Sequence, residues 1–441
     1  MSDTGAILAA LTLVVLIVVE FPIAYAFAAA AMVLAFTTGR DLSLTVPTAF
    51  WQTGSFALLA LPLFIVAGTV MAAAEISDRL VAVVERVVGR VRGSLGAVTV
   101  LSCMLFGAIS GSGSAAIAAI GSVMIPKMRQ AGYSHGYATS LVACSSVLAL
   151  LIPPSIPMIV FALTAGLSVS TCFLSTVGPG IGIGLIYIFM NYRWCKRNDV
   201  DPPHRRTAQR AAAGHAADES FARTVWRGGP ALFMPILMLG GIYSGIFTPT
   251  EAAAVALVYA LIVGLFVYRT IGWRNGTKAL IDGGVVSASV VVILFFLLIF
   301  AKLLTIEGIP RDIALFLTEL SSNYYVGLLF INIVLLILGM FIDDISGSIL
   351  AAVVLMPVAT EIGVDPIHFA AIVGTNLGLG NVTPPCAPLL FVAGSVSGLS
   401  LRNFLTPALR FMLFGHLPVV LLVTYLPDLA LFVPRLLMSG S

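Results

Sequence analysis

Long apolar segments recur along the whole chain, separated by short polar stretches. Because about 20 apolar residues cross the hydrocarbon core of a bilayer as a helix, each segment is a candidate membrane element. The first series of apolar segments covers residues 5–19, 21–38, 56–74, 97–126, 138–164 and 172–192. A second series with the same rhythm covers residues 229–246, 250–268, 283–304, 324–360, 367–395 and 409–427. The pattern predicts an all-α polytopic membrane protein with two similar halves.

The two halves are also related residue by residue. When residues 126–174 are moved forward by 231 positions without a gap, ten of them meet identical residues. Four of these are prolines, in a chain that is 59% hydrophobic but has only 23 prolines. The matched prolines are Pro126, Pro153, Pro154 and Pro157, which meet Pro357, Pro384, Pro385 and Pro388. Duplicated halves that Gly and Pro interrupt at matching positions are typical of secondary transporters.

A basic stretch joins the halves and predicts their orientation. Residues 193–227 carry eight Arg or Lys side chains, so the positive-inside rule places this linker in the cytoplasm. We therefore divide the chain into a first repeat, residues 1–192, the linker, and a second repeat, residues 228–441.

Two apolar segments are predicted to enter the membrane and return to the same side. Residues 97–126 have basic flanks on both sides and are interrupted by a Ser-Gly-Ser-Gly-Ser run, which predicts an inner re-entrant hairpin. Residues 324–360 are interrupted by two Asp residues and are followed by acidic Glu361 and Asp365, which predicts an outer hairpin. Such halves insert in opposite directions, as in inverted-repeat transporters. The prediction is ten crossings and two hairpins, with both termini outside the cell.

Four interruptions carry the candidate chemistry. They are the hairpin tips at 110–114 and 343–348 and the proline-broken helices at 138–164 and 367–395. Non-helical backbone at membrane depth is tolerated only where it is buried in protein or lines a cavity. Carbonyls freed before the prolines suit a monovalent cation, and the N-termini of half-helices suit an anion. One cavity between the interruptions can hold both.

Each interruption also has a structural interpretation. Glycine runs in membrane helices usually serve close packing, which is how we interpret the glycines of 178–184. The tip at 110–114 repeats polar residues where a turn is needed, so there we favour contact with a cation or substrate. An acid in a membrane segment is a functional hypothesis by default. Asp343 or Asp344 can equally cap the half-helix that follows.

Composition and charge exclude several classes of protein. Only 10% of the residues are charged, against about 25% in soluble domains, so the chain requires a bilayer. The net charge of +3 comes from basic loops and not from a basic face, which argues against nucleic-acid binding. The five cysteines show no paired spacing and predict neither disulfides nor a transition-metal site. Lys302, near Glu307, is interpreted as a residue whose amine extends to the membrane surface.

Two other functions fit the sequence less well. An anion channel requires a continuous polar path across the membrane, whereas these interruptions belong to paired hairpins that end within it. An intramembrane serine protease requires a Gly-x-Ser-Gly nucleophile with a histidine in the membrane. Residues 110–113 do not have that pattern, and no histidine in a predicted span pairs with them. We therefore expect a transporter and not an enzyme.

These motifs together resemble a known family. The motifs are Ser-Gly-Ser-Gly-Ser at 110–114, Ile-Pro-Pro-Ser-Ile-Pro at 152–157, Phe-Ile-Asp at 341–343 and Gly-Asn-Val-Thr-Pro-Pro at 380–385. In order and spacing they resemble the large membrane subunit of tripartite ATP-independent periplasmic (TRAP) transporters. The resemblance implies a sodium-driven importer of an organic acid in the bacterial inner membrane, with an elevator mechanism and no cofactor besides Na⁺. It also implies two partners: a periplasmic substrate-binding protein, and a small four-helix membrane subunit on a separate polypeptide. The alternative is a self-sufficient sodium/dicarboxylate symporter of related fold.

The resemblance implies two sodium sites and a substrate site. The implied sodium ligands are Ser110, Gly111, Ser112, Ser114, Ser145 and Val147 in the first half and Asp343, Ser346, Asn376, Gly378, Asn381 and Thr383 in the second. The substrate anion is expected between the tips, against Ser112, Ser114, Pro154, Ser155, Thr383, Pro385 and Cys386. Because no Arg or Lys falls inside a tip or a break, anion binding there depends on N–H groups, hydroxyls and bound cations.

Overall fold

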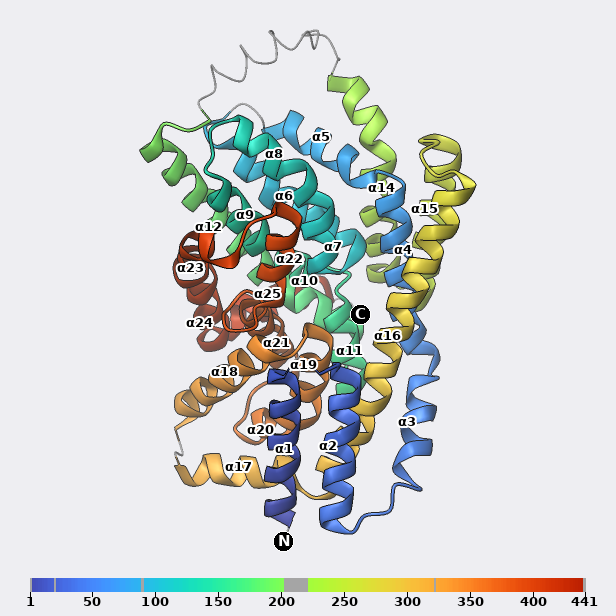
Figure 1. The fold of residues 1–441 in the computed structure, drawn as a ribbon, viewed down its shortest axis with the longest axis vertical. Helices are drawn as coiled ribbons and strands as arrows, with labels where there is room; N and C mark the ends of the chain where they lie inside the picture. Colours follow the sequence, from blue (N-terminus) through green and yellow to red (C-terminus); the bar gives the residue numbers. More distant parts are fainter. Residues whose placement is uncertain (1, 20, 89–90, 202–220, 321–322, 439–441) are drawn as a thin grey trace.

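The computed structural model describes residues 2–19, 21–88, 91–201, 221–320 and 323–438 (Figure 1). Within these ranges the regular structure is entirely helical. Eight of the described helical segments are long and apolar enough to cross a membrane. Many large apolar side chains are exposed on them, as lipid contact requires. The all-α, multi-pass prediction is confirmed. Residues 202–220 of the predicted linker lie outside the described residues.

The first helices of each half form one layer, which we call the scaffold (Figure 1). Its first-half elements are α1 (Ser2–Val18), α2 (Ile23–Thr38), α3 (Thr45–Thr53), η1 (Phe56–Leu59) and α4 (Ala60–Ala73). Its second-half elements are α14 (Phe221–Tyr243), α15 (Pro249–Ile262), η3 (Val263–Val267) and α16 (Trp273–Ile306). Helices α4 and α16 lie in close contact, and the Thr69 hydroxyl donates to the Ala279 carbonyl at 3.0 Å. Gly283 permits this approach, because a Cβ there would lie 3.0 Å from the Val66 Cα.

Most of the remaining helices form a second layer, which we call the core (Figure 1). Its first-half elements are α6 (Ser94–Ser110), α7 (Gly113–Ala116), η2 (Ile117–Gly121), α8 (Ser122–Gln130), α9 (His135–Ser146), α10 (Leu148–Leu151), α11 (Ile156–Ala165) and α12 (Val169–Asn198). From the second half come α18 (Tyr324–Phe341), α19 (Asp344–Leu350), η4 (Ala351–Leu355), α20 (Met356–Glu361), α21 (Pro366–Gly380), α22 (Pro388–Ser397), η5 (Leu401–Asn403), α23 (Leu405–Phe411), η6 (Met412–His416), α24 (Leu417–Tyr425) and α25 (Pro427–Met438). In an apolar 18-residue stretch of the broken helix 135–165, 83% of the residues are buried, against 33% in the corresponding stretch of α16. The broken helix therefore forms the centre of this layer.

The order of elements repeats between the halves. In each half a helical hairpin turns at a short break, carries a π-helical turn in its return arm (η2 and η4), and is followed by a helix that breaks before a proline pair. The proline pairs at 153–154 and 384–385 both contain a cis peptide bond. The shift of 231 positions aligns Val147 with Gly378, and the two residues are in contact in the structure. A Cβ on Gly378 would lie 2.5 Å from Val147 Cγ1. In Figure 1, α8 and α20 lie toward opposite ends of the long axis. Insertion in opposite directions across a membrane stays a prediction.

The structure also contains helices that the apolar pattern did not predict. Amphipathic α5 (Ile76–Val88) and α17 (Ile309–Leu320) precede the two hairpins, and α3 precedes α4. Helix α16 begins at Trp273, ten residues before the predicted apolar segment. At 1.5 Å per residue its 34 residues span about 51 Å, longer than the hydrocarbon core of about 30 Å. Hydrophobicity predicts only the part of a helix that contacts lipid, so polar extensions are missed.

Candidate functional site

A cavity of about 720 Å³ lies between the scaffold and the core, and we call it the central cavity. Its scaffold wall comes from α4 and α16, including Gly68, Thr69, Val286 and Val290. Its core wall holds Ser110, Gly111, Ser112 and Ser114 from the first hairpin tip and Asp344 from the second. The tips of both hairpins therefore reach one cavity. The scaffold residues of the lining were not predicted, because only the fold brings α4 and α16 to the tips.

The first hairpin tip is a short turn pressed against the broken helix. Gly111 ends α6 with a φ of +62°, a backbone conformation that favours glycine. A Cβ there would lie 2.7 Å from the Pro154 carbonyl oxygen, so the tip touches the break between α10 and α11. Ser112 then caps α7 by accepting from the Ala115 N–H at 3.4 Å, and its hydroxyl lies 3.1 Å from that of Ser114. Two hydroxyls and a half-helix N-terminus thus face the central cavity.

The second tip has a similar arrangement with a carboxylate. Asp343 caps α19, because its Oδ2 accepts from the N–H groups of Ile345 and Ser346, each at 3.1 Å. The capping interpretation of Asp343 is therefore correct for one of its two oxygens. The backbones of α18 and α21 meet at this tip, since a Cβ on Gly380 would lie 2.5 Å from the Gly339 Cα.

Several buried oxygens at these breaks have no hydrogen-bond partner among the residues that the structure describes. They are Ser145 Oγ, Asp343 Oδ1, Ser346 Oγ and Asn381 Oδ1. Leaving one such group unpaired costs about 1–3 kcal/mol. Unpaired buried atoms occur elsewhere too, Ser102 Oγ among them, but these four lie at or beside the tips and breaks. An oxygen that accepts no hydrogen bond is available to a cation.

Asn376, one of the predicted sodium ligands, is held by hydrogen bonds to neighbouring helices. The Asn376 amide donates to Asn332 Oδ1 at 2.7 Å, and Thr424 donates to the same oxygen at 3.0 Å. These bonds join α18, α21 and α24. Asn332 was not among the predicted site residues, although a lone amide inside an apolar segment is a recognisable signal.

The predicted substrate residues of the two helix breaks lie outside the wall of the central cavity. Thr383 donates to the Leu379 carbonyl at 2.7 Å, and Ser155 caps α11 by accepting from the Met158 N–H at 3.4 Å. Leu389, at the start of α22, lies 3.1 Å from a Cβ placed on Gly113. The lining of the central cavity does not include Pro154, Ser155, Thr383, Pro385 or Cys386.

No cluster of typical metal-binding side chains is found in the described part of the chain. Nowhere within those ranges do three His, Cys, Asp or Glu side chains gather in a way that can hold a metal ion. Four of the five cysteines are buried and Cys386 is half-buried.

Comparison with known proteins identifies the family. The family model for the DctM component of tripartite ATP-independent periplasmic transporters matches residues 10–429. The chain belongs to this family. It is therefore an integral membrane component of a transport system, and the resemblance seen in its motifs is confirmed.

DctM relatives match over most of this chain. It is 37% identical to the C4-dicarboxylate TRAP transporter large permease protein DctM of Pseudomonas aeruginosa, covering 86% of each chain. It is 34% identical to the isethionate TRAP transporter permease protein DctMQ of Oleidesulfovibrio alaskensis, over 94% of this chain but only 64% of that longer protein. It is 32% identical to the sialic acid TRAP transporter large permease protein SiaM of Vibrio cholerae, over 87% of this chain and 88% of the relative.

The fold of this DctM chain is similar to that of a solved transporter. The crystal structure of the Alcanivorax borkumensis YdaH transporter, described as having an unusual topology, superposes with a TM-score of 0.60. The alignment covers 86% of this chain and 87% of that one at 16% sequence identity. At that identity the likeness supports the fold alone.

Proposed function

We propose that this DctM-family chain is the large permease subunit of a sodium-coupled importer of an organic acid in the bacterial inner membrane. The observation that carries the proposal is the set of buried oxygens at the hairpin tips and helix breaks that have no hydrogen-bond partner among the described residues. Carboxylate, hydroxyl and carbonyl oxygens are the ligands that hard cations prefer. Sodium is cargo in this proposal, since it enters with the substrate.

The two sodium sites use the two tips and the two breaks. The first combines Ser110, Gly111, Ser112 and Ser114 with Ser145 and the carbonyl near Val147. The second combines Asp343 and Ser346 with Asn381, Thr383 and carbonyls near Asn376 and Gly378. Three second-site residues, Asp343, Ser346 and Asn381, carry an unpaired buried oxygen, as does Ser145 of the first. The Asn376 amide nitrogen is bonded to Asn332, so Asn376 contributes through oxygen.

The substrate is an organic acid. The DctM relatives carry the names of isethionate, C4-dicarboxylate, 2,3-diketo-L-gulonate and sialic acid transporters, all of them organic anions. We place the anion in the central cavity against Ser112 and Ser114, with Pro154, Ser155, Thr383, Pro385 and Cys386 behind the tip. Half-helix N-termini and bound sodium supply the positive potential that a carboxylate needs there.

The energy comes from the sodium gradient and the membrane potential. Each cation that enters down 100 mV contributes about 2.3 kcal/mol, so two or more can move one carboxylate uphill. The layered structure supports an elevator mechanism, because the ion and substrate residues belong to the core while the scaffold contributes the opposite wall of the cavity. In this proposal the core slides along the scaffold.

Partners complete the transporter. A small membrane subunit binds the scaffold, and a periplasmic binding protein delivers the acid; the name DctMQ of one relative is consistent with a permease that combines two components. The self-sufficient sodium/dicarboxylate symporter remains the alternative function.

Uptake into proteoliposomes tests the proposal. The chain is reconstituted with its small partner, and uptake of a labelled organic acid is measured with and without a sodium gradient and with and without the binding protein. Uptake that requires both supports the tripartite, sodium-coupled function. Sodium-driven uptake without a binding protein supports the self-sufficient symporter, and uptake that ignores sodium contradicts both.

A further inference from the structure

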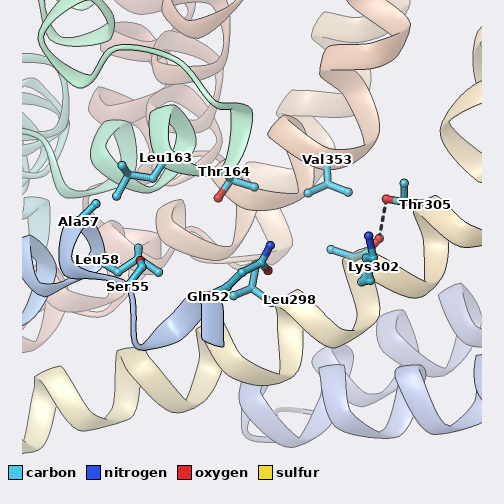
Figure 2. A pocket seen from close by; sticks show the side chains of 11 residues that line it. Gln52, Ser55, Ala57, Leu58, Leu163, Thr164, Leu298, Lys302, Thr305 and Val353 are labelled. Carbon is cyan, nitrogen blue, oxygen red and sulfur yellow. Dashed lines mark hydrogen bonds between the residues drawn. The ribbon is translucent and has the colours of Figure 1, made fainter. Parts of the chain in front are cut away.

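A second cavity of about 370 Å³ lies between the scaffold and the core, near the end of α16 (Figure 2). Its polar lining residues are Gln52, Ser55, Thr164, Lys302 and Thr305. They come from three places: the end of α3, the end of α11 in the core, and the last turns of α16. The volume lies within the range of about 300–1,000 Å³ that is usual for small-molecule sites.

Different turns of α16 line the second cavity and the central one. Along α16, Val286 and Val290 line the central cavity, whereas Leu298 and Ala301 line the second. The eight residues from Val290 to Leu298 correspond to about 12 Å of helix. Leu294, within that interval, is buried. The stretch of α16 between the two cavities is therefore apolar and partly buried.

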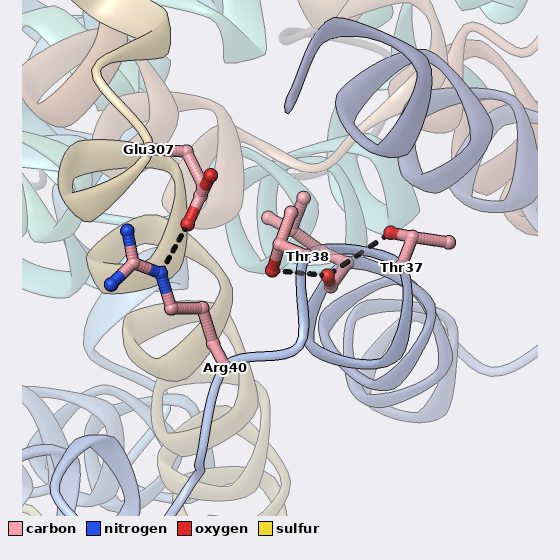
Figure 3. Close-up of polar contacts among 5 residues, drawn as sticks. Thr37, Thr38, Arg40 and Glu307 are labelled. Carbon is pink, nitrogen blue, oxygen red and sulfur yellow. Dashed lines mark hydrogen bonds and ion pairs between the residues drawn. The ribbon is translucent and has the colours of Figure 1, made fainter. Parts of the chain in front are cut away.

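The charge of Lys302 is not neutralised by the acid nearest to it in sequence. Glu307 instead pairs with Arg40, from the loop after α2, at 2.7 Å, and the Glu307 side chain is only 7% exposed (Figure 3). Thr37 and Thr38, drawn beside this pair, donate to the Leu34 carbonyl of their own helix. Lys302 itself makes no hydrogen bond or ion pair with any residue in the described ranges. The interpretation of Lys302 as an amine that extends to the surface beside Glu307 is therefore incomplete, because the residue lines a cavity.

The surroundings of Lys302 suit a carboxylate with hydrogen-bonding substituents. Gln52, Ser55 and Thr164 offer amide and hydroxyl groups across the cavity from the ammonium group (Figure 2). The Thr305 hydroxyl is already used, since it donates to the Ala301 carbonyl at 2.9 Å. An adjoining cavity of about 520 Å³ shares Thr305 and Val353 and adds Arg311 together with Glu361. The described lining of the central cavity, by contrast, contains Asp78 and Asp344 but no Arg or Lys.

We propose that this second cavity is an anion-binding vestibule in which Lys302 pairs with a carboxylate of the incoming acid before the central cavity opens to it. Its place in the uptake path rests on the proposed function, because only the predicted orientation puts the end of α16 outside the cell. A full positive charge at the entrance raises the local concentration of anions. It also leaves the central site free of a fixed cation that would hold the substrate too tightly for release.

Chemical modification of an engineered cysteine tests the vestibule without relying on transport. Gln52→Cys is introduced into the full chain in right-side-out membrane vesicles, and the chain without this substitution measures the background reaction of Cys386. The introduced cysteine is modified with two membrane-impermeant methanethiosulfonate reagents. One is anionic and carries a sulfonate, and the other is cationic and carries a trimethylammonium group. For each chain we take the rate of modification by the anionic reagent divided by the rate with the cationic reagent. This ratio is compared between the chain with Lys302 and the Lys302→Met and Lys302→Arg variants. Lys278→Met, on the same helix, is the control.

With Lys302 or Lys302→Arg, we expect the anionic reagent to be favoured about tenfold relative to Lys302→Met, and Lys278→Met to leave the ratio unchanged. Succinate should slow modification in the Lys302 chain more than uncharged succinamide at the same concentration. Three results would overturn the proposal. They are a change of less than twofold in the ratio with Lys302→Met, equal protection by succinate and succinamide, and modification only from the cytoplasmic side. If these results hold while sodium-driven uptake fails, the anion site stands and the proposed function does not.

Discussion

Single residues at the helix breaks have two roles at once. Asp343 uses one carboxylate oxygen to begin α19 and leaves the other buried and unpaired. A cap alone contributes about 0.5–2 kcal/mol, and it needs only one oxygen. The start of the helix therefore does not account for the free oxygen, which the proposed sodium site would use.

Asp343→Asn separates these two roles. Asparagine also caps helices well, so folding should be preserved while the negative charge is lost. We expect the sodium concentration for half-maximal uptake to rise at least about tenfold, which corresponds to about 1.4 kcal/mol of binding. Asp365→Asn is the control, since Asp365 caps α21 in the same way through Ile367 and His368. Unchanged sodium dependence in the Asp343 variant would exclude a direct ligand.

Asn332 holds the second break together by accepting from Asn376 and Thr424. Replacement by Leu removes one acceptor from each donor, while Asn376 still donates to the Ile372 carbonyl and Thr424 to the Val420 carbonyl. The loss of the shared contacts costs about 0.6–2 kcal/mol in a membrane interior. We expect the thermal midpoint of the purified protein to fall by a few degrees. Asn198→Leu serves as the control, because that side chain is exposed and bonds only to the carbonyl of Trp194. Equal midpoints for the two variants would show that the network contributes nothing to stability.

The helical hairpins are positioned by backbone contact and not by large side chains. Gly107 of α6 lies against Ala149, and Gly339 of α18 lies against Gly380. These contacts set how closely each hairpin approaches the neighbouring broken helix. Small residues that allow such approach are the usual means of packing helices in membranes.

Gly380→Ala tests this packing. The added methyl group would lie 2.5 Å from the Gly339 Cα, so α18 must move away from α21. Overpacking of this kind costs about 1–3 kcal/mol, and we expect a lower thermal midpoint together with weaker sodium dependence. Gly284→Ala on α16 is the matched control, because nothing lies within 4 Å of its Cβ position. The control should gain up to about 1 kcal/mol from helix propensity.

The whole molecule consists of two layers with cavities between them. Within the scaffold, α4 and α16 share direct hydrogen bonds such as Thr69 to Ala279. Between the layers lie the central cavity and the vestibule, with an apolar, partly buried stretch of α16 between them. Apolar surfaces can slide without breaking hydrogen bonds, which is the condition that an elevator motion requires.

Cross-linking distinguishes sliding layers from a rigid molecule. Cysteines at Ala72 of α4 and Ala119 of η2 line opposite walls of the central cavity, and a flexible bis-maleimide between them should abolish uptake. A pair at Thr69 and Ala279 joins two helices of the scaffold and should leave uptake within about twofold. Full activity with the cross-cavity link in place would contradict the elevator mechanism.

The sequence determined the features that depend on local composition. Apolar length predicted the membrane class, and a Gly-Ser run, a pair of Asp residues and two proline pairs predicted the four breaks. A left-handed turn, a capping side chain or a missing N–H ends a helix wherever it occurs. The shift of 231 positions predicted the repeated order of elements. Polar helices such as α3, α5 and α17 were missed, since they need not be apolar to pack at the membrane surface.

The tertiary structure decided which partner each polar group finds. Glu307 pairs with Arg40, 267 positions away, and not with Lys302 five positions away. Asn376 bonds to Asn332, Asp343 keeps one oxygen free, and α4 and α16 complete a cavity whose other wall holds residues of both hairpin tips. Hydrogen bonds, ion pairs and cavities form between segments distant in sequence, so they depend on how the helices pack, which local patterns do not contain.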